Sequence, residues 1–204
     1  MQQVIEIPAD LENMQLPNPD LLDYYKNYKD RVYWVEDEID ESIMALSKMI
    51  MECNRDDKSI PVDERKPIKI FISSYGGLLD ETMALVKLIG ISKTPIITIN
   101  ACRAYSAASL ILIAGHKRYT LPGTKCLFHS GSATMGDATF EQAQAASDDY
   151  RKLVKQMQEY ILSRTKIERK LFNKKKAYDW YLYADEMLEQ GIVDKIVNDL
   201  DEIV

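Results

Sequence analysis

The chain contains 204 residues, a length typical of one large domain or of one domain with an appendage. Hydrophobic residues make up 46% and charged residues 28%, which is enough apolar material for a core and excludes disordered, collagen-like and coiled-coil proteins. The net charge of −6 gives no general attraction to nucleic acid or to an anionic membrane, so neither is an expected partner.

Acidic and basic residues are unevenly distributed along the chain. Residues 1–64 contain 16 Asp and Glu against 6 Lys and Arg, whereas Arg164–Lys176 contains seven basic residues and one acid. The simplest interpretation is two solvated faces, and the alternative is a pair of complementary surfaces between subunits.

The sequence carries no feature of export or membrane insertion. Its longest apolar stretch is far shorter than the ~20 residues of a membrane span. The first residues have neither the basic region nor the apolar region of a signal peptide. We therefore expect a cytoplasmic protein.

Metal and cofactor motifs are also missing from the sequence. The cysteines, Cys53, Cys102 and Cys126, form no C-x-x-C pair and have no histidines at metal-ligand spacing. The phosphate-binding and dinucleotide-binding glycine motifs are absent. We expect reduced, mostly buried cysteines, no metal ion and no cofactor.

In chain order, the pattern begins with an N-terminal extension. Residues 1–20 are polar, contain three prolines and show little periodicity, whereas the hydrophobic pattern typical of a folded domain begins near Tyr24. We expect an N-terminal arm over residues 1–23 and a single domain over residues 24–204.

The domain itself alternates between strand-like and helix-like segments. Runs of β-branched and aromatic residues bounded by turns predict strands, and apolar residues at a period of 3.6 predict helices. This alternation indicates an α/β fold built from β-α-β units. The expected strands cover residues 31–35, 67–73, 95–99, 117–121 and 125–128, and the expected helices cover 39–51, 79–89 and 106–114, with a loop at 54–66.

A long helix is expected over residues 139–164. Thr139 and Gln142 fit a capping box, and an apolar stripe runs from Tyr150 to Ile161. Such a helix would be about 38 Å long. Its first half is poor in apolar residues, which indicates that the helix projects beyond its own core, towards another subunit.

The two histidines, His116 and His129, simplify the search for acid-base chemistry. His116 follows Gly115 at the end of a predicted helix, where an imidazolium near the last carbonyls is ordinary structural chemistry. His129 ends a predicted strand and precedes a loop, a common position for a presented catalytic group. His129 is therefore the stronger candidate for function.

Ser106 lies between a predicted strand and the helix that follows it. The commonest role for a serine in that place is the helix N-cap. The alternative is a nucleophile, held where free backbone N–H groups and the positive helix end stabilise an oxyanion. Position alone favours the cap.

Two further features give weak signals. Gly76 and Gly77 lie between a strand and a helix, where glycines free the backbone to point N–H groups outward. Asp179 lies among aromatic residues, and a partly buried acid there would need a partner such as a histidine or a lysine. Local spacing does not separate Asp179 from Asp185 or Asp194.

Three stretches taken together resemble the proteolytic subunit of the Clp protease, the ClpP family of serine peptidases. They are Ser73–Gly77, Cys102–His129 and Asp179–Asp194, and their joint occurrence in this order is specific. The likeness covers about residues 24–197. It implies a crotonase-like spiral of ββα units with a projecting handle helix, here residues 139–164.

The resemblance also implies roles for individual residues. By position, Ser106 matches the family nucleophile, His129 its general base and Asp179 the acid that orients the histidine. The backbone N–H groups of Gly77 and Ala107 match the family's oxyanion donors. Those roles would complete a Ser-His-Asp triad.

At the level of the assembly, the resemblance implies a homo-oligomer. Family members stack two seven-membered rings around their active sites and hydrolyse peptides or unfolded proteins, a reaction that itself consumes no ATP. An AAA+ unfoldase is the partner on which they rely to degrade folded proteins.

The sequence departs from the family pattern near the site. Tyr75 replaces the usual proline before the two glycines, Tyr105 replaces a small residue before the serine, and Ser130-Gly131 replaces Gln-Pro after the histidine. We expect Tyr105 to narrow or reshape the peptide pocket. The loop at 54–66 is longer than usual, and residues 1–20 do not resemble the family's axial-pore segment.

These features leave three hypotheses open. The first is an active serine endopeptidase in a self-compartmentalised oligomer, and the second is a regulatory or structural subunit with weak catalysis. The third is an acyl-CoA-binding relative of crotonase, which would not need Ser106, His129 and Asp179 together. Signal peptide peptidase relatives use a Ser–Lys pair and normally a membrane anchor, which this sequence lacks.

Overall fold

The structure is a computed structural model that describes residues 26–132 and 137–203. Within these residues the chain forms a mixed α/β fold with a mostly parallel sheet, which confirms the predicted fold class. The arm expected over residues 1–23 lies outside the described residues, and the single domain over residues 24–204 stays a prediction.

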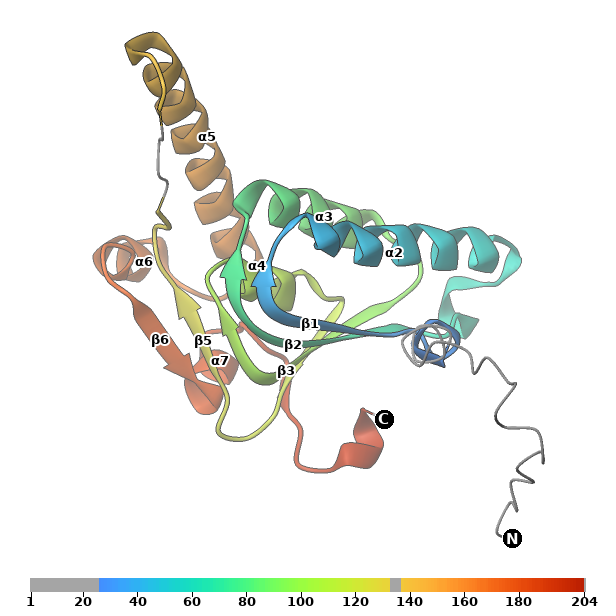
Figure 1. Cartoon of the computed structure of the whole chain (residues 1–204). Helices are drawn as coiled ribbons and strands as arrows, with labels where there is room; N and C mark the ends of the chain where they lie inside the picture. The colour runs from blue at the N-terminus through green and yellow to red at the C-terminus, as the bar shows by residue number, and fades with distance from the viewer. Residues whose placement is uncertain (1–25, 133–136, 204) are drawn as a thin grey trace, which may run out of the picture.

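A seven-stranded sheet forms the centre of the fold (Figure 1). The strand order is β1-β2-β3-β4-β7, and β5 pairs with both β3 and β6. The β5–β6 pair is antiparallel, and the other pairings of the described strands are parallel. The strands are β1 (Val32–Ile39), β2 (Ile68–Gly77), β3 (Ile96–Tyr105), β4 (Lys117–Thr120), β5 (Lys125–Phe128), β6 (Trp180–Tyr183) and β7 (Lys195–Ile196).

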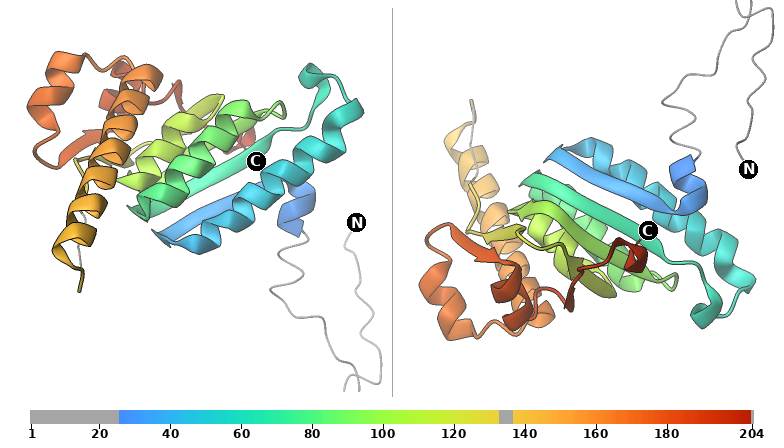
Figure 2. Two further views of the ribbon diagram at one scale, coloured as in Figure 1. Left: turned by 90° about the horizontal axis from the view of Figure 1, so that it is seen from above. Right: turned by 90° about the horizontal axis from the view of Figure 1, so that it is seen from below.

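Helices cover one face of this sheet, and the C-terminal segment lies against the other (Figures 1 and 2). Helix α4 is apolar all round and completely buried, because it packs on β2 and β3 beneath α3 and α5. The opposite face carries a smaller apolar cluster around Phe71, Ile99 and Val197. The helices are α2 (Met44–Asp56), α3 (Leu79–Ile91), α4 (Ala107–Ala114), α5 (Phe140–Arg164), α6 (Arg169–Lys175) and α7 (Ala184–Glu189), with short 3-10 turns at Glu41–Ile43, Asp57–Ser59, Val62–Glu64 and Leu200–Glu202.

Strands β2 and β3 are longer than the sequence pattern predicted. The predicted strands end at Ser73 and Ile99, but β2 continues to Gly77 and β3 to Tyr105. Pairing with neighbouring strands explains the extra length, because β2 stays paired with β1 as far as Gly77 and β3 pairs with β5 as far as Tyr105. Both strands therefore end at, or directly before, candidate site residues.

The segment predicted as a loop at residues 54–66 is more ordered than its composition indicated. Asp57 is 1% exposed and accepts hydrogen bonds from the Arg31 guanidinium at 2.6 and 2.7 Å and from the Thr94 hydroxyl at 2.9 Å. The Arg31 guanidinium holds the pKa of the Asp57 carboxyl below its usual range. These groups satisfy one another, so a polar segment is fixed against the start of β1.

Helix α5 confirms the long helix expected over residues 139–164. It has 25 residues and begins with a capping box between Thr139 and Gln142. Met157 and Ile161 are its buried residues, and Figure 1 shows the N-terminal half extending away from the sheet and its helices. No described helix combines the length and the apolar character needed to cross a lipid bilayer.

The cation at the C-terminal end of α4 is Arg164, which corrects the expectation for His116. Arg164 donates hydrogen bonds at 2.8–3.3 Å to the carbonyls of residues 113–115. His116 instead uses Nδ1 to accept the Ile96 N–H at 2.9 Å. Burial, together with the nearby Arg164, lowers the pKa of His116, so a neutral imidazole occupies this position.

Candidate active site

Ser106 lies at a sharp junction between β3 and α4. Its φ of 52° is positive, a conformation that costs a residue other than glycine on the order of 1–3 kcal/mol. The junction is held by a hydrogen bond of 3.0 Å from the Ser106 N–H to the Leu127 carbonyl on β5. Ser106 occupies the N-cap position of α4, but its side chain makes no capping bond. The cap interpretation is therefore wrong, and the hydroxyl is free for another partner.

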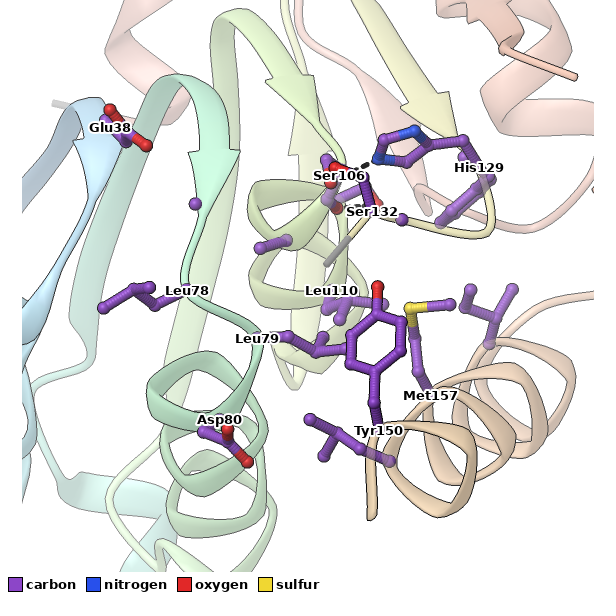
Figure 3. Close-up of a pocket in the computed structure, with 17 residues that line it drawn as sticks. Glu38, Leu78, Leu79, Asp80, Ser106, Leu110, His129, Ser132, Tyr150 and Met157 are labelled. Carbon is purple, nitrogen blue, oxygen red and sulfur yellow. Dashed lines mark hydrogen bonds between the residues drawn. The ribbon is translucent and has the colours of Figure 1, made fainter. Parts of the chain in front are cut away.

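That partner is His129, which follows directly after β5. The Ser106 Oγ and His129 Nε2 atoms lie 2.6 Å apart, as the dashed line in Figure 3 shows. The two residues meet because β5 runs parallel to β3, with Tyr105 opposite Leu127, so both strands end at the same edge of the sheet. A serine hydroxyl at this distance from an imidazole is placed to give up its proton.

Asp179 lies on the other side of the imidazole. It directly precedes β6, whose antiparallel pairing sets Trp180 opposite Phe128 and so brings Asp179 beside His129. The distance between Asp179 Oδ1 and His129 Nδ1 is 3.6 Å, which is longer than a hydrogen bond. The Asp179 side chain is 57% exposed, so the expected burial among aromatic residues is wrong.

The two other aspartates that local spacing left open have different surroundings. Asp194 accepts hydrogen bonds from the Arg118 backbone N–H at 2.9 Å and from its guanidinium. Asp185 lies in the first turn of α7. Among the described residues, Asp179 is the carboxylate that the fold places next to His129.

Gly76 explains how closely β2 approaches the nucleophile. A Cβ atom at Gly76 would lie 2.8 Å from the Ser106 Cβ atom and 2.9 Å from the Ala107 amide nitrogen. The φ of Gly76 is also positive, at 99°. Its neighbour Gly77 is equally constrained, because a Cβ there would lie 2.1 Å from the Ile39 carbonyl oxygen. Gly76 thus brings the β2 backbone against the first residue of α4, and Gly77 brings it against the end of β1.

A cavity of about 440 Å³ opens beside these groups, and Gly77, Ala107, Ser106 and His129 all line it (Figure 3). Its walls are mainly apolar side chains from α3, α4 and α5, and two exposed acids lie at its edge. The apolar residues are Leu79, Leu110, Leu153, Met157 and Ile161, and the acids are Glu38 and Asp80.

Tyr150 is a lining residue that sequence reasoning did not identify as functional. Figure 3 shows its phenol extending from α5 towards Ser106 and Ser132. Burial raises the pKa of this phenol, which therefore stays neutral and can donate a hydrogen bond. The sequence placed Tyr150 on a helical stripe, and only the position of α5 over the site shows that the stripe also forms a cavity wall.

Of the residues that depart from the family pattern, Tyr75, Tyr105 and Ser130 lie outside this cavity, whereas Gly131 lines it. Tyr105 does not line it, and the expectation that Tyr105 narrows or reshapes the peptide pocket stays a prediction. The Tyr105 ring instead contacts the rings of Tyr75 and Tyr181. Ser130, after the histidine, donates a hydrogen bond of 2.6 Å to the Lys176 carbonyl and so ties the residue after His129 to the end of α6.

The described residues contain no cluster of three or more His, Cys, Asp and Glu side chains that could hold a metal ion. Cys53 and Cys126 are buried free thiols, whereas Cys102 is exposed. Burial raises the pKa of the Cys126 thiol, which is unsuited to act as a nucleophile.

A strained serine that contacts a histidine at the edge of a parallel sheet is the arrangement of a serine hydrolase. Comparison with known proteins narrows this class. The family model described as Clp protease matches residues 23–199. The chain therefore belongs to the Clp protease family, whose fold it shares, and has the role of a peptidase.

A curated relative agrees with this assignment. The protein named ATP-dependent Clp protease proteolytic subunit 2 from Treponema denticola is 32% identical over 141 residues. The match covers 68% of this chain and 70% of that protein. The resemblance noted in the sequence is thus confirmed at the level of the family.

Proposed function

We propose that this chain is a serine endopeptidase in which Ser106 is the nucleophile and His129 the general base. The observation that carries the proposal is the 2.6 Å contact between Ser106 Oγ and His129 Nε2 at a strained strand-to-helix junction. Backbone strain at a polar residue is typical of active sites, because the rest of the fold must hold a conformation that adds nothing to stability.

The chemistry follows from the order of the groups. His129 accepts the Ser106 proton while Oγ attacks the carbonyl carbon of the peptide bond, and it returns the proton to the leaving amine. Water then enters and releases the acyl group by the same steps. Asp179, on the Nδ1 side of the ring, stabilises the imidazolium that forms in each transition state.

The backbone N–H groups of Gly77 and Ala107 are the proposed oxyanion donors. Both residues line the cavity at Ser106, and Ala107 begins α4, whose positive end favours a developing negative charge. The close approach of β2 at Gly76 sets the separation of these two backbone segments.

The cavity supports a preference on the acyl side of the scissile bond. Its volume of about 440 Å³ and its Leu79, Leu110 and Met157 walls favour a large apolar side chain. Tyr150 adds a single hydrogen-bond donor near Ser106 and Ser132, and such a group orients a peptide without requiring a charge on it.

For the assembly, we propose a homo-oligomer of two stacked seven-membered rings in the cytoplasm, formed by the single domain of residues 24–204 and fed by an AAA+ unfoldase. The exposed N-terminal half of α5 supports an assembly, because it extends away from the core of its own chain. The relative from Treponema denticola is itself named a subunit of an ATP-dependent protease.

A regulatory subunit with weak catalysis is the second candidate function. It is favoured by one observation, the 3.6 Å separation and high exposure of Asp179 beside His129. In that case the third member of the triad would need a partner chain to bring it into contact.

Turnover of internally quenched peptides tests the proposal. The purified full chain should cleave peptides with a large apolar residue before the scissile bond, and Ser106→Ala should remove this activity. Cleavage retained by Ser106→Ala would overturn the assignment. Native mass spectrometry on the same samples reports the subunit number, and an inactive wild-type oligomer that stimulates a partner peptidase would establish the regulatory function instead.

A further inference from the structure

Three tyrosines form a cluster at the edge of the sheet that carries Ser106. The Tyr105 ring contacts Tyr75 with centroids 6.0 Å apart and Tyr181 with centroids 5.6 Å apart, both edge to face. The Arg103 guanidinium lies over the Tyr75 ring, 4.4 Å from its centroid. Tyr75, Tyr105, Tyr181 and Arg103 are called the tyrosine cluster below.

Each tyrosine lies on a different strand, within two residues of a candidate site residue. Tyr75 lies two residues before Gly77 on β2, Tyr105 directly precedes Ser106 on β3, and Tyr181 lies two residues after Asp179 on β6. The cluster therefore joins three strands one step behind the reacting groups. Two of its members, Tyr75 and Tyr105, are also residues at which this sequence departs from the ClpP pattern.

The cluster and the cavity lie on opposite faces of the sheet. On β3, Ala104 is buried in the main core beneath the helices, so the next residue, Tyr105, points to the other face. On β2, Tyr75 lies at an irregularity in the pairing with β1, and its ring contacts the Tyr105 ring, so it lies on the same side of the sheet as Tyr105. The cavity, in contrast, is lined by α3, α4 and α5.

Much of the cluster remains open to solvent. Tyr75 is 63% exposed and Tyr181 is 45% exposed in the described chain. Exposed aromatic rings that already contact one another offer further edge-to-face positions to an incoming ring, and they lose little conformational freedom when it binds. The stacked Arg103 fixes the Tyr75 ring from the side.

A peptide that reacts at Ser106 has two halves that leave the serine in opposite directions. If its acyl half fills the cavity on the helix-covered face, its leaving-group half passes over the sheet edge towards the open face. We propose that the tyrosine cluster is the subsite for the leaving-group half and selects an aromatic side chain directly after the scissile bond. This inference rests on the proposed peptidase function and extends it to the other side of the cleaved bond.

The test compares two quenched peptides that differ only in the residue after the scissile bond, Phe or Ala, with the cleaved bond verified by mass spectrometry. The wild type should favour the Phe peptide in kcat/KM by about 2- to 12-fold, the range expected for one aromatic pair. Tyr75→Ala should bring this ratio close to one. The matched control Tyr75→Phe keeps the ring and should keep the ratio.

A binding measurement separates failure of the subsite from failure of the peptidase. Ser106→Ala and the Ser106→Ala/Tyr75→Ala double variant are titrated with fluorescent peptides that begin with Phe or Ala. Preference for Phe in the first protein and its loss in the second support the subsite even if the wild type cleaves nothing. The proposal is overturned if the wild type and Tyr75→Ala have equal Phe-to-Ala ratios. It is also overturned if Tyr75→Ala forms a smaller oligomer but keeps its preference for Phe, because the cluster is then a contact between subunits.

Discussion

The two sides of the His129 ring are built differently. On the Nε2 side, the contact to Ser106 is 2.6 Å long, and both residues follow parallel strands deep in the fold. On the Nδ1 side, Asp179 lies 3.6 Å away at the start of a short outer strand and is 57% exposed. The inner strands of the sheet thus position the nucleophile and the base, whereas the position of the acid is set by the outer strand β6. We infer that the first contact controls activity and that the second adjusts it.

Removing the nucleophile should have the largest effect. Ser106→Ala should lower kcat by about 10⁴- to 10⁶-fold, the loss seen when a serine protease loses a triad member. Steady-state peptide turnover measures it, with circular dichroism as the control for folding. A loss of less than about tenfold would show that another residue performs the attack.

Displacing the nucleophile should come next. Gly76→Ala places a Cβ within 3 Å of Ser106 and Ala107, so the junction must shift, and a displacement of about 1 Å can cost on the order of 10²-fold in rate. The variant should remain folded, because the clash is confined to the C-terminal end of β2. Wild-type kcat in a folded Gly76→Ala protein would contradict the view that β2 sets the position of the serine.

Asp179→Asn tests the loosely held side of the ring. Replacing a buried triad aspartate costs about 10⁴-fold. Asp179 is exposed and beyond hydrogen-bond distance in this chain, so we expect a smaller loss than for Gly76→Ala. A loss of about 10⁴-fold would mean that assembly closes the gap and buries the carboxylate.

The pH dependence of kcat/KM tests the contact between His129 and Ser106. A general base must be unprotonated to accept the serine proton, so kcat/KM should increase from acidic to neutral pH. The profile of Asp179→Asn should keep this shape. A rate that stays constant over the same interval would exclude His129 as the base.

Changes far from the site should affect stability and leave activity unchanged. Asp57→Asn breaks a buried pair with Arg31 and should lower the free energy of unfolding by about 3–5 kcal/mol, measured by urea denaturation. Because Arg31 lowers the folded-state pKa of Asp57, its contribution is complete above the ordinary value of ~3.9 and is lost as the pH falls through the folded-state value. If the free energy of unfolding of the wild type were the same at pH 3 as at pH 6, this role would be contradicted.

The sequence predicted those features of the fold that depend on residues close together in the chain. The capping box at Thr139 and the apolar period predicted α5 to within a residue, and the β-α-β alternation predicted the fold class. It did not predict where a strand ends when pairing with neighbouring strands sets that end. The ends of β2 and β3 contain glycines and polar residues, and only pairing with β1 and β5 keeps them extended.

The candidate site shows the same limit. For Ser106, position alone favoured a helix cap, because nothing in the local sequence reveals that the hydroxyl lies 2.6 Å from a histidine 23 residues away. Asp179 was indistinguishable from Asp185 and Asp194 until the β5–β6 pairing placed it beside His129. Tyr150 shows a period typical of packing, and its place in a cavity depends on where α5 crosses the sheet edge.

The most direct measurement is the intact mass of the chain after treatment with a small fluorophosphonate, which reacts with an activated serine and needs no assumed substrate. The account predicts one adduct for each wild-type chain, mapped to Ser106, lost in Ser106→Ala and His129→Ala, and slowed but present in Asp179→Asn. An unmodified wild-type protein, or an adduct that forms equally well in His129→Ala, would contradict the claim that the Ser106–His129 contact activates the serine.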